Sequence, residues 1–69
     1  MKYNLKWTNI YSNETGYVGS VSKKKGCFIN ATNKADAKTY ASEKTAQKEI
    51  VLLGELGEAE NNRFELEIA

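Results

Sequence analysis

Residues 2–11 read KYNLKWTNIY, and this stretch indicates the fold class because large apolar side chains recur at alternate positions. A period of two is typical of a β-strand with one face buried and the other in water. The apolar face would carry Tyr3, Leu5, Trp7 and Tyr11. The other face would carry Lys2, Asn4, Lys6 and Thr8. The chain is therefore predicted to open with a half-buried strand.

A β-hairpin is predicted to follow this strand. Residues 12–16 are turn formers, and further strands are predicted over residues 17–22 and from Cys27 to about Ala31. Between these two strands lies a tip made of Lys23, Lys24, Lys25 and Gly26. Glycine suits the left-handed position of such a turn.

The length of the tip determines which side chains share a face. A three-residue loop would place Val21 opposite Ile29, on the same face as Tyr17, whereas a four-residue loop would pair Val21 with Phe28 and turn Ile29 outward. The first arrangement buries more aliphatic surface and is preferred. With an odd-length first loop, Trp7 would face Val21. The predicted centre of the sheet is then Trp7, Val21 and Ile29.

A helix is predicted from Glu43 to about Leu56, with Ser42 as N-cap and Gly57 as C-cap. Its apolar stripe would contain Ala46, Ile50, Leu53 and Leu56, with Leu52 at the margin and Val51 exposed. Residues 63–68 alternate again and predict a last strand. Its inward side chains would be Phe64, Leu66 and Ile68. The predicted architecture is a single small α+β domain over residues 1–69, ordered β-β-β-α-β, an antiparallel sheet with a single helix packed on one face.

Charge is divided unevenly along the chain, although the net charge is +1. Residues 1–48 carry nine lysines and three acidic residues, whereas residues 49–69 carry one arginine and six glutamates. If the last strand pairs with the first, Glu65 and Glu67 would lie near Lys2 and Lys6, and the halves would neutralise each other. Such asymmetry can also mark a nucleic-acid surface. The intramolecular interpretation is favoured.

The residue inventory argues against catalysis and cofactor binding. The chain has no histidine and a single cysteine, Cys27, so a disulfide or a recognised metal-ligand set cannot be assembled. Cys27 is expected to point inward as an inert apolar side chain, although the neighbouring lysines could lower a thiol pKa. No apolar run fits a signal peptide or a membrane span, and an unpaired cysteine suits a reducing compartment. We expect a cytoplasmic protein that is no enzyme, holds no cofactor and does not contact the membrane.

The predicted open face of the sheet is the candidate partner surface. Its members are Lys6, Thr8, Ile10, Val18, Ser20, Ser22, Lys23, Lys24, Lys25 and Phe28. Ile10 and Val18 would lie opposite each other with Phe28 nearby, which makes a small apolar patch among polar and basic groups. This surface suits a protein partner, a homodimer contact or the groove of a nucleic acid.

The whole chain resembles the small uncharacterised proteins carried by phages and prophages of Gram-positive bacteria. The resemblance rests on residues 2–6 (KYNLK), residues 16–18 (GYV) and residues 37–46 (AKTYASEKTA), together with the proline-free composition rich in lysine, asparagine and glutamate. It implies a non-enzymatic protein-interaction module, an accessory protein of a phage or mobile element. Some proteins of this kind inhibit or adapt host proteins.

Tyr40, Ser42, Lys44 and Ala46 also resemble the stretch that enters the helix in AP2-like arm-binding domains of phage-type integrases. In that family the open sheet face enters the DNA major groove. The resemblance would therefore assign DNA contacts to Lys6, Thr8, Ser20, Ser22 and Lys23. This chain departs from the family by its fourth strand, by the lack of arginine in the first three strands and by the lack of a catalytic domain. A small DNA-binding domain is therefore the alternative function.

Overall fold

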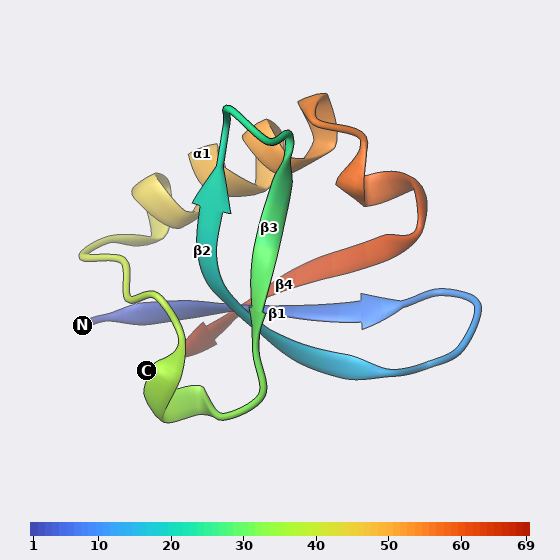
Figure 1. Cartoon of the computed structure of the whole chain (residues 1–69). Helices are drawn as coiled ribbons and strands as arrows, with labels where there is room; N and C mark the ends of the chain where they lie inside the picture. Colours follow the sequence, from blue (N-terminus) through green and yellow to red (C-terminus); the bar gives the residue numbers. More distant parts are fainter.

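The computed structural model describes residues 1–69 as a four-stranded antiparallel sheet with one helix, α1, across one face (Figure 1). The strands are β1 (Tyr3–Asn9), β2 (Thr15–Ser22), β3 (Cys27–Ala31) and β4 (Asn62–Ile68). The helices are α1 (Glu43–Glu55) and two single 3-10 turns, η1 (Lys34–Asp36) and η2 (Glu58–Glu60). The strand order is β3-β2-β1-β4. This confirms the predicted β-β-β-α-β architecture.

The last strand, β4, pairs with the first strand, β1, at one edge of the sheet. β1 and β4 are in register from Tyr3 opposite Ile68 to Asn9 opposite Asn62. Alternation then puts Leu5 and Trp7 on the helix-facing side beside Leu66 and Phe64, as predicted. The prediction that Ile68 also points inward is wrong. Ile68 is 56% exposed because it ends the strand at the margin of the core.

The β2–β3 hairpin has the four-residue loop, so the preferred register is wrong. Val21 lies opposite Phe28, and Ser22 lies opposite Cys27. The tip is closed by the Gly26 amide, which donates to the Ser22 carbonyl at 2.9 Å, with Gly26 in the left-handed region at φ 70°. This register turns Phe28 inward, where its ring meets the Phe64 ring edge-on at a centroid distance of 5.5 Å. Burying an aromatic ring outweighs burying Ile29.

A β-bulge in β2 changes which side chains face the core. The register shifts between Val18 and Ser20, so the extra residue, Gly19, reverses the alternation. Val18 and Val21 therefore both face the core, although strict alternation would place them on opposite faces. In the β1–β2 pair, Trp7 lies opposite Gly16 and not opposite Val21, because an even number of residues connects Thr8 to Thr15. The predicted sheet centre of Trp7, Val21 and Ile29 is therefore wrong, for Trp7 because of this connection and for Ile29 because of the four-residue loop.

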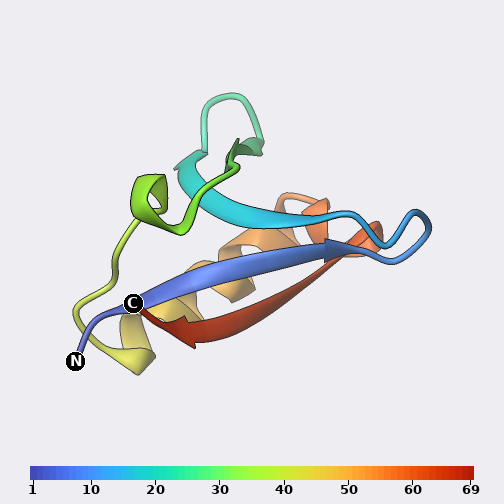
Figure 2. The ribbon, with the colours of Figure 1, turned by 90° about the horizontal axis from the view of Figure 1, so that it is seen from below.

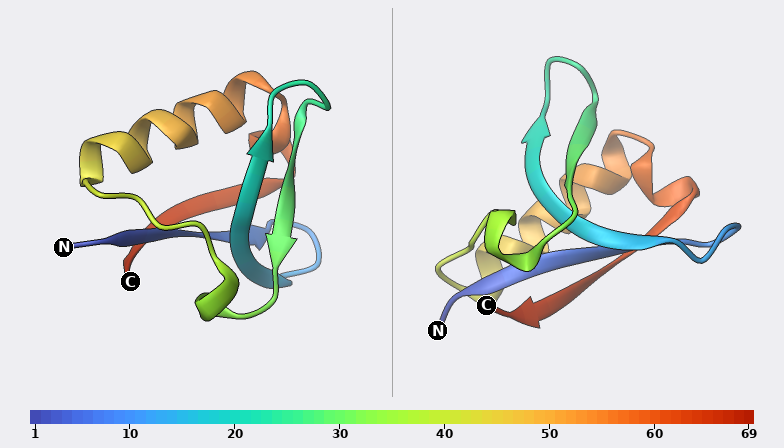
Figure 3. Two further views of the ribbon diagram at one scale, coloured as in Figure 1. Left: turned by 60° about the vertical axis from the view of Figure 1, so that its left-hand side comes forward. Right: turned by 60° about the horizontal axis from the view of Figure 1, so that its bottom comes forward.

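Beyond Val18, β2 curves away from β1, and the segment 38–40 takes its place beside β1. The Lys38 amide donates to the Val18 carbonyl at 3.0 Å, and Tyr3 and Tyr40 exchange two backbone hydrogen bonds. The side-chain amide of the buried Asn4 donates to the Lys38 carbonyl at 3.0 Å. The β2–β3 hairpin therefore stands away from the plane of β1 and β4 (Figures 2 and 3).

Helix α1 follows the predicted pattern closely. Ser42 caps it by accepting a hydrogen bond from the Thr45 amide at 3.2 Å, while Leu53 is fully buried and Val51 is 62% exposed. Leu56 is the C-cap, and Gly57, predicted as the cap, follows it in the left-handed conformation at φ 85°. The core under the helix consists of Leu5, Val18, Tyr40, Ala46 and Leu53.

Candidate interaction surface

The structure distributes the ten predicted surface residues over four regions. Four of them lie in strands and are half-buried, namely Lys6, Thr8, Ser20 and Ser22. Ile10 lies in the turn after β1, 47% exposed. Val18 and Phe28 face the core, so their placement on the open face is wrong, because of the bulge and the four-residue loop respectively. The apolar patch expected from Ile10, Val18 and Phe28 does not exist as a surface.

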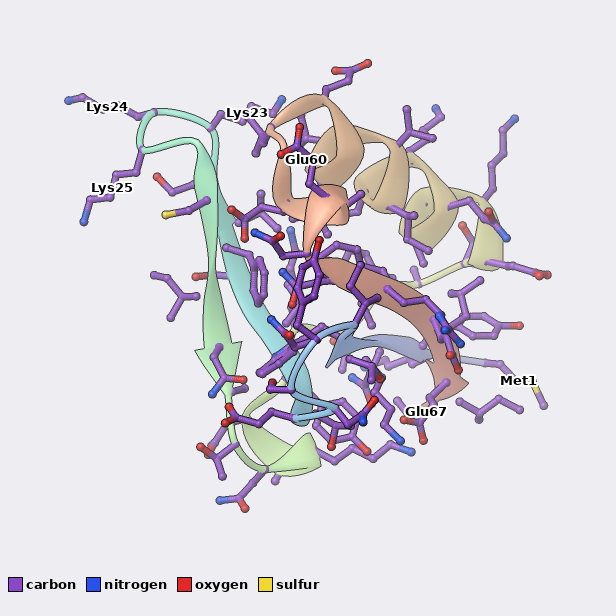
Figure 4. The ribbon with its side chains drawn as sticks, turned by 90° about the vertical axis from the view of Figure 1, so that its right-hand side faces the viewer. Met1, Lys23, Lys24, Lys25, Glu60 and Glu67 are labelled. Atoms are coloured by element: carbon purple, nitrogen blue, oxygen red, sulfur yellow. The ribbon has the colours of Figure 1, made fainter.

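The three remaining residues, Lys23, Lys24 and Lys25, form the end of the β2–β3 hairpin and are called the lysine tip below. All three are exposed, and none makes an ion pair. Figure 4 shows Lys24 and Lys25 projecting outward from the end of the hairpin. Ser22, which precedes the tip, organises the turn, since its hydroxyl accepts a hydrogen bond from the Lys25 amide at 3.2 Å. Three unpaired charges on consecutive residues make this a local source of positive potential.

The outer side of β3 adjoins the lysine tip. Ile29 is 55% exposed there, and Cys27 lies on the same side because it is two residues away in the same strand. The expectation that Cys27 points inward is therefore wrong, because the four-residue loop turns Phe28 inward instead. Sequence reasoning missed Ile29 as a surface residue. The four-residue loop, which was the alternative to the preferred register, would have predicted that Ile29 faces the solvent.

The outer side of β1 and β4 has mixed charge. Glu65 lies opposite Lys6, as predicted, and Glu67 lies opposite Asn4. The Glu67 carboxylate lies 3.8 Å from the ammonium of Lys34, which also donates to the Ile68 carbonyl at 2.6 Å. Charges from the two halves of the chain thus meet on this face. The lysine tip takes no part in this pairing.

Two tyrosines are held in their neutral form. Tyr40 donates its hydroxyl to Glu49 at 3.2 Å, and Lys38 binds the same carboxylate oxygen at 3.0 Å. Burial, followed by the negative charge of Glu49, raises the pKa of Tyr40 above its ordinary value. Partial burial and the neighbouring Glu67 likewise raise the pKa of Tyr17. Both phenols therefore favour the protonated form in the folded protein.

These raised pKa values predict a loss of stability in alkali. Folding favours the protonated phenols, so their contribution is intact below the unfolded-state pKa of about 10 and is lost as the pH rises toward the higher folded-state values. Urea unfolding at a series of pH values should show this decline. Tyr40→Phe should make the decline shallower, and adding Tyr17→Phe should flatten it further. An equally steep decline in the double variant would contradict the assignment.

Comparison with the models of known families, with curated proteins and with solved structures gives no match for this chain. None of its helices has both the length and the apolar content needed to cross a membrane.

Proposed function

We propose that this chain is a non-enzymatic protein-interaction module that binds its partner through the β2–β3 hairpin. The observation that carries the proposal is the lysine tip, three exposed and unpaired cations beside the exposed Ile29. An exposed apolar side chain next to unpaired charge supplies both contact area and electrostatic steering. The resemblance to small phage and prophage proteins supports a role as an accessory protein of a mobile element.

The tip of the hairpin is suited to binding because it lies outside the core. The hydrogen bonds of the tip stay within its own turn, and its lysines make no ion pair, whereas Glu67 of β4 is paired with Lys34. Side chains at the tip can therefore change without disturbing Leu5 or Leu53. This separation allows binding and folding to be tested independently.

Affinity capture from a bacterial lysate, quantified by mass spectrometry and run with and without nuclease, tests the proposal. A variant with all three tip lysines changed to alanine should lose the proteins that the wild type enriches. The matched control changes Lys2, Lys44 and Lys48 to alanine, since these are also exposed and make no ion pair. It should retain the same proteins. Equal capture by wild type, tip variant and control would place the partner elsewhere and overturn the proposal.

A small DNA-binding domain is the second candidate, because the same unpaired lysines could contact phosphates. Two features count against it. Val18 and Phe28 face the core, so they cannot contact DNA, and the outer side of β4 carries the acidic residues Glu65 and Glu67, which phosphates would repel. Titration with duplex DNA at increasing salt distinguishes the two functions. Binding at about 50 mM salt that weakens steeply with ionic strength, and less steeply in the tip variant, would favour DNA. No binding under these conditions would remove that candidate.

A further inference from the structure

The two edges of the sheet differ in how open they are to another strand. β3 and β4 are the end strands, so each has one side with no neighbouring strand. An end strand presents unpaired N–H and C=O groups, which are a template for pairing with another chain. Natural proteins protect such edges with charged side chains, bulges or covering elements.

β4 has this protection and β3 lacks it. The sequence of β4 is NRFELEI, with a charged side chain at every second position on one side. The sequence of β3 is CFINA, which contains no charge and places Ile29 in solvent. The inner side of β3 is also firmly held, because Phe28 packs on Trp7 and Phe64, and Asn30 accepts a hydrogen bond from the Trp7 indole at 2.7 Å. The open edge is therefore a preformed template.

The charge around this edge indicates what would bind there. The lysine tip directly precedes β3, and its three cations have no acidic neighbour in an ion pair. A strand lying along β3 would bring its own side chains close to these lysines. Acidic side chains on that strand would be attracted, whereas basic ones would be repelled.

From these observations we infer that the partner contributes an extended acidic segment, which adds to β3 as a fifth strand. Main-chain hydrogen bonds to β3 supply affinity. Ile29 contacts apolar side chains of the added strand, which fall on one face at every second position, and the lysine tip selects for acidic residues. The inference rests on the proposed function, since it specifies the chemistry of a partner bound at the same hairpin.

Titration of the ¹⁵N-labelled protein with a synthetic peptide of alternating glutamate and valine tests this mode of binding. The amide resonances of Cys27–Ala31 should shift most, and their hydrogen exchange should slow because new main-chain hydrogen bonds form. A matched peptide of alternating lysine and valine should bind much more weakly. Shifts centred on β4 or α1, or equal binding of the two peptides, would overturn the inference.

Ile29→Glu gives the edge the acidic charge that β4 carries at Glu65 and Glu67, and it should weaken binding of the glutamate peptide by about tenfold, because it repels the peptide and removes the apolar contact. Val51→Glu is the matched control, because Val51 is an exposed aliphatic residue on α1, and its variant should bind as the wild type does. Equal binding by the two variants would contradict the role of the β3 edge. Self-association that broadens the β3 resonances without peptide would assign the edge to a second copy instead.

The two experiments fail in different ways. If the tip variant captures the wild-type set of proteins, the proposed function fails, and the inference fails with it. If capture depends on the lysine tip but the glutamate peptide leaves the β3 amides unchanged, the hairpin binds its partner in another manner. The proposed function then stands and the strand-addition inference is overturned.

Discussion

Replacing Leu53 with alanine is expected to lower the free energy of unfolding by about 2–5 kcal/mol. Leu53 is fully buried and packs in the cluster with Leu5, Val18 and Ala46. Truncating it removes apolar contacts and leaves a cavity. A chain of 69 residues has a total stability of roughly 3–10 kcal/mol, so the variant should be close to its unfolding threshold. Urea unfolding followed by circular dichroism measures the loss.

The control for this prediction lies on the same helix. Val51→Ala removes an aliphatic group that is 62% exposed, so it should change the free energy of unfolding by less than about 0.5 kcal/mol. Leu53→Met, which nearly conserves volume, should cost less than about 1.5 kcal/mol and keeps the site measurable if the alanine variant unfolds. Similar losses at positions 51 and 53 would mean that α1 packs by a different face.

Gly16→Ala is expected to destabilise the fold by about 1–3 kcal/mol through overpacking. A Cβ atom at this position would lie 2.7 Å from Trp7 Nε1 and 2.8 Å from Cε2, and it would also meet Asn30 Oδ1. The indole would have to move away from its hydrogen bond with Asn30. Because Trp7 is the only tryptophan, its fluorescence should shift toward longer wavelength as it becomes more exposed to water.

Gly54→Ala is the matched control, and the opposite sign is expected. Gly54 lies inside α1, where a Cβ atom would make only an ordinary contact of 4.0 Å with the Ala59 Cβ. Alanine should therefore raise the free energy of unfolding by about 0.5–1 kcal/mol, since glycine is the poorer helix former. If Gly16→Ala changed neither the free energy of unfolding nor the fluorescence, the Trp7 indole would not be packed against the backbone of β2.

The proposed binding surface lies apart from the residues that stabilise the fold. The buried cluster lies between α1 and the sheet, whereas the lysine tip and Ile29 lie outside it. Variants of the tip and of Ile29 are therefore expected to fold. A loss of partner capture in those variants can then be assigned to the surface.

Local patterns in the sequence were sufficient for the elements and for part of the topology. The period-two alternation of residues 2–11 predicts β1, and Ser42 with the stripe through Leu53 predicts α1 and its buried face. The opposite charges of Lys6 and Glu65 favoured a last strand beside the first but left its place in the sheet undecided, and the structure shows this pairing. Each of these inferences depends on residues that are close in sequence, or on the pairing of opposite charges.

The candidate site was less predictable from the sequence. The lysine tip is recognisable because three consecutive lysines precede a glycine in a turn. The exposure of Ile29 and the burial of Val18 and Phe28 were not recognisable. Alternation divides the side chains of a strand into two sets but does not say which set faces the core. A loop that is longer by one residue therefore exchanges the buried and the exposed set of the whole strand.

The sequence by itself therefore determined the fold class, the helix with its buried face and the basic tip. Tertiary structure alone decided the bulge at Gly19, the four-residue loop and the place of Tyr40 in the core beside β1. The physical reason is that these features depend on which large side chains fill the space beneath α1. Packing of Phe28 against Trp7 and Phe64 chooses the register, and this same choice turns Ile29 outward beside the lysines.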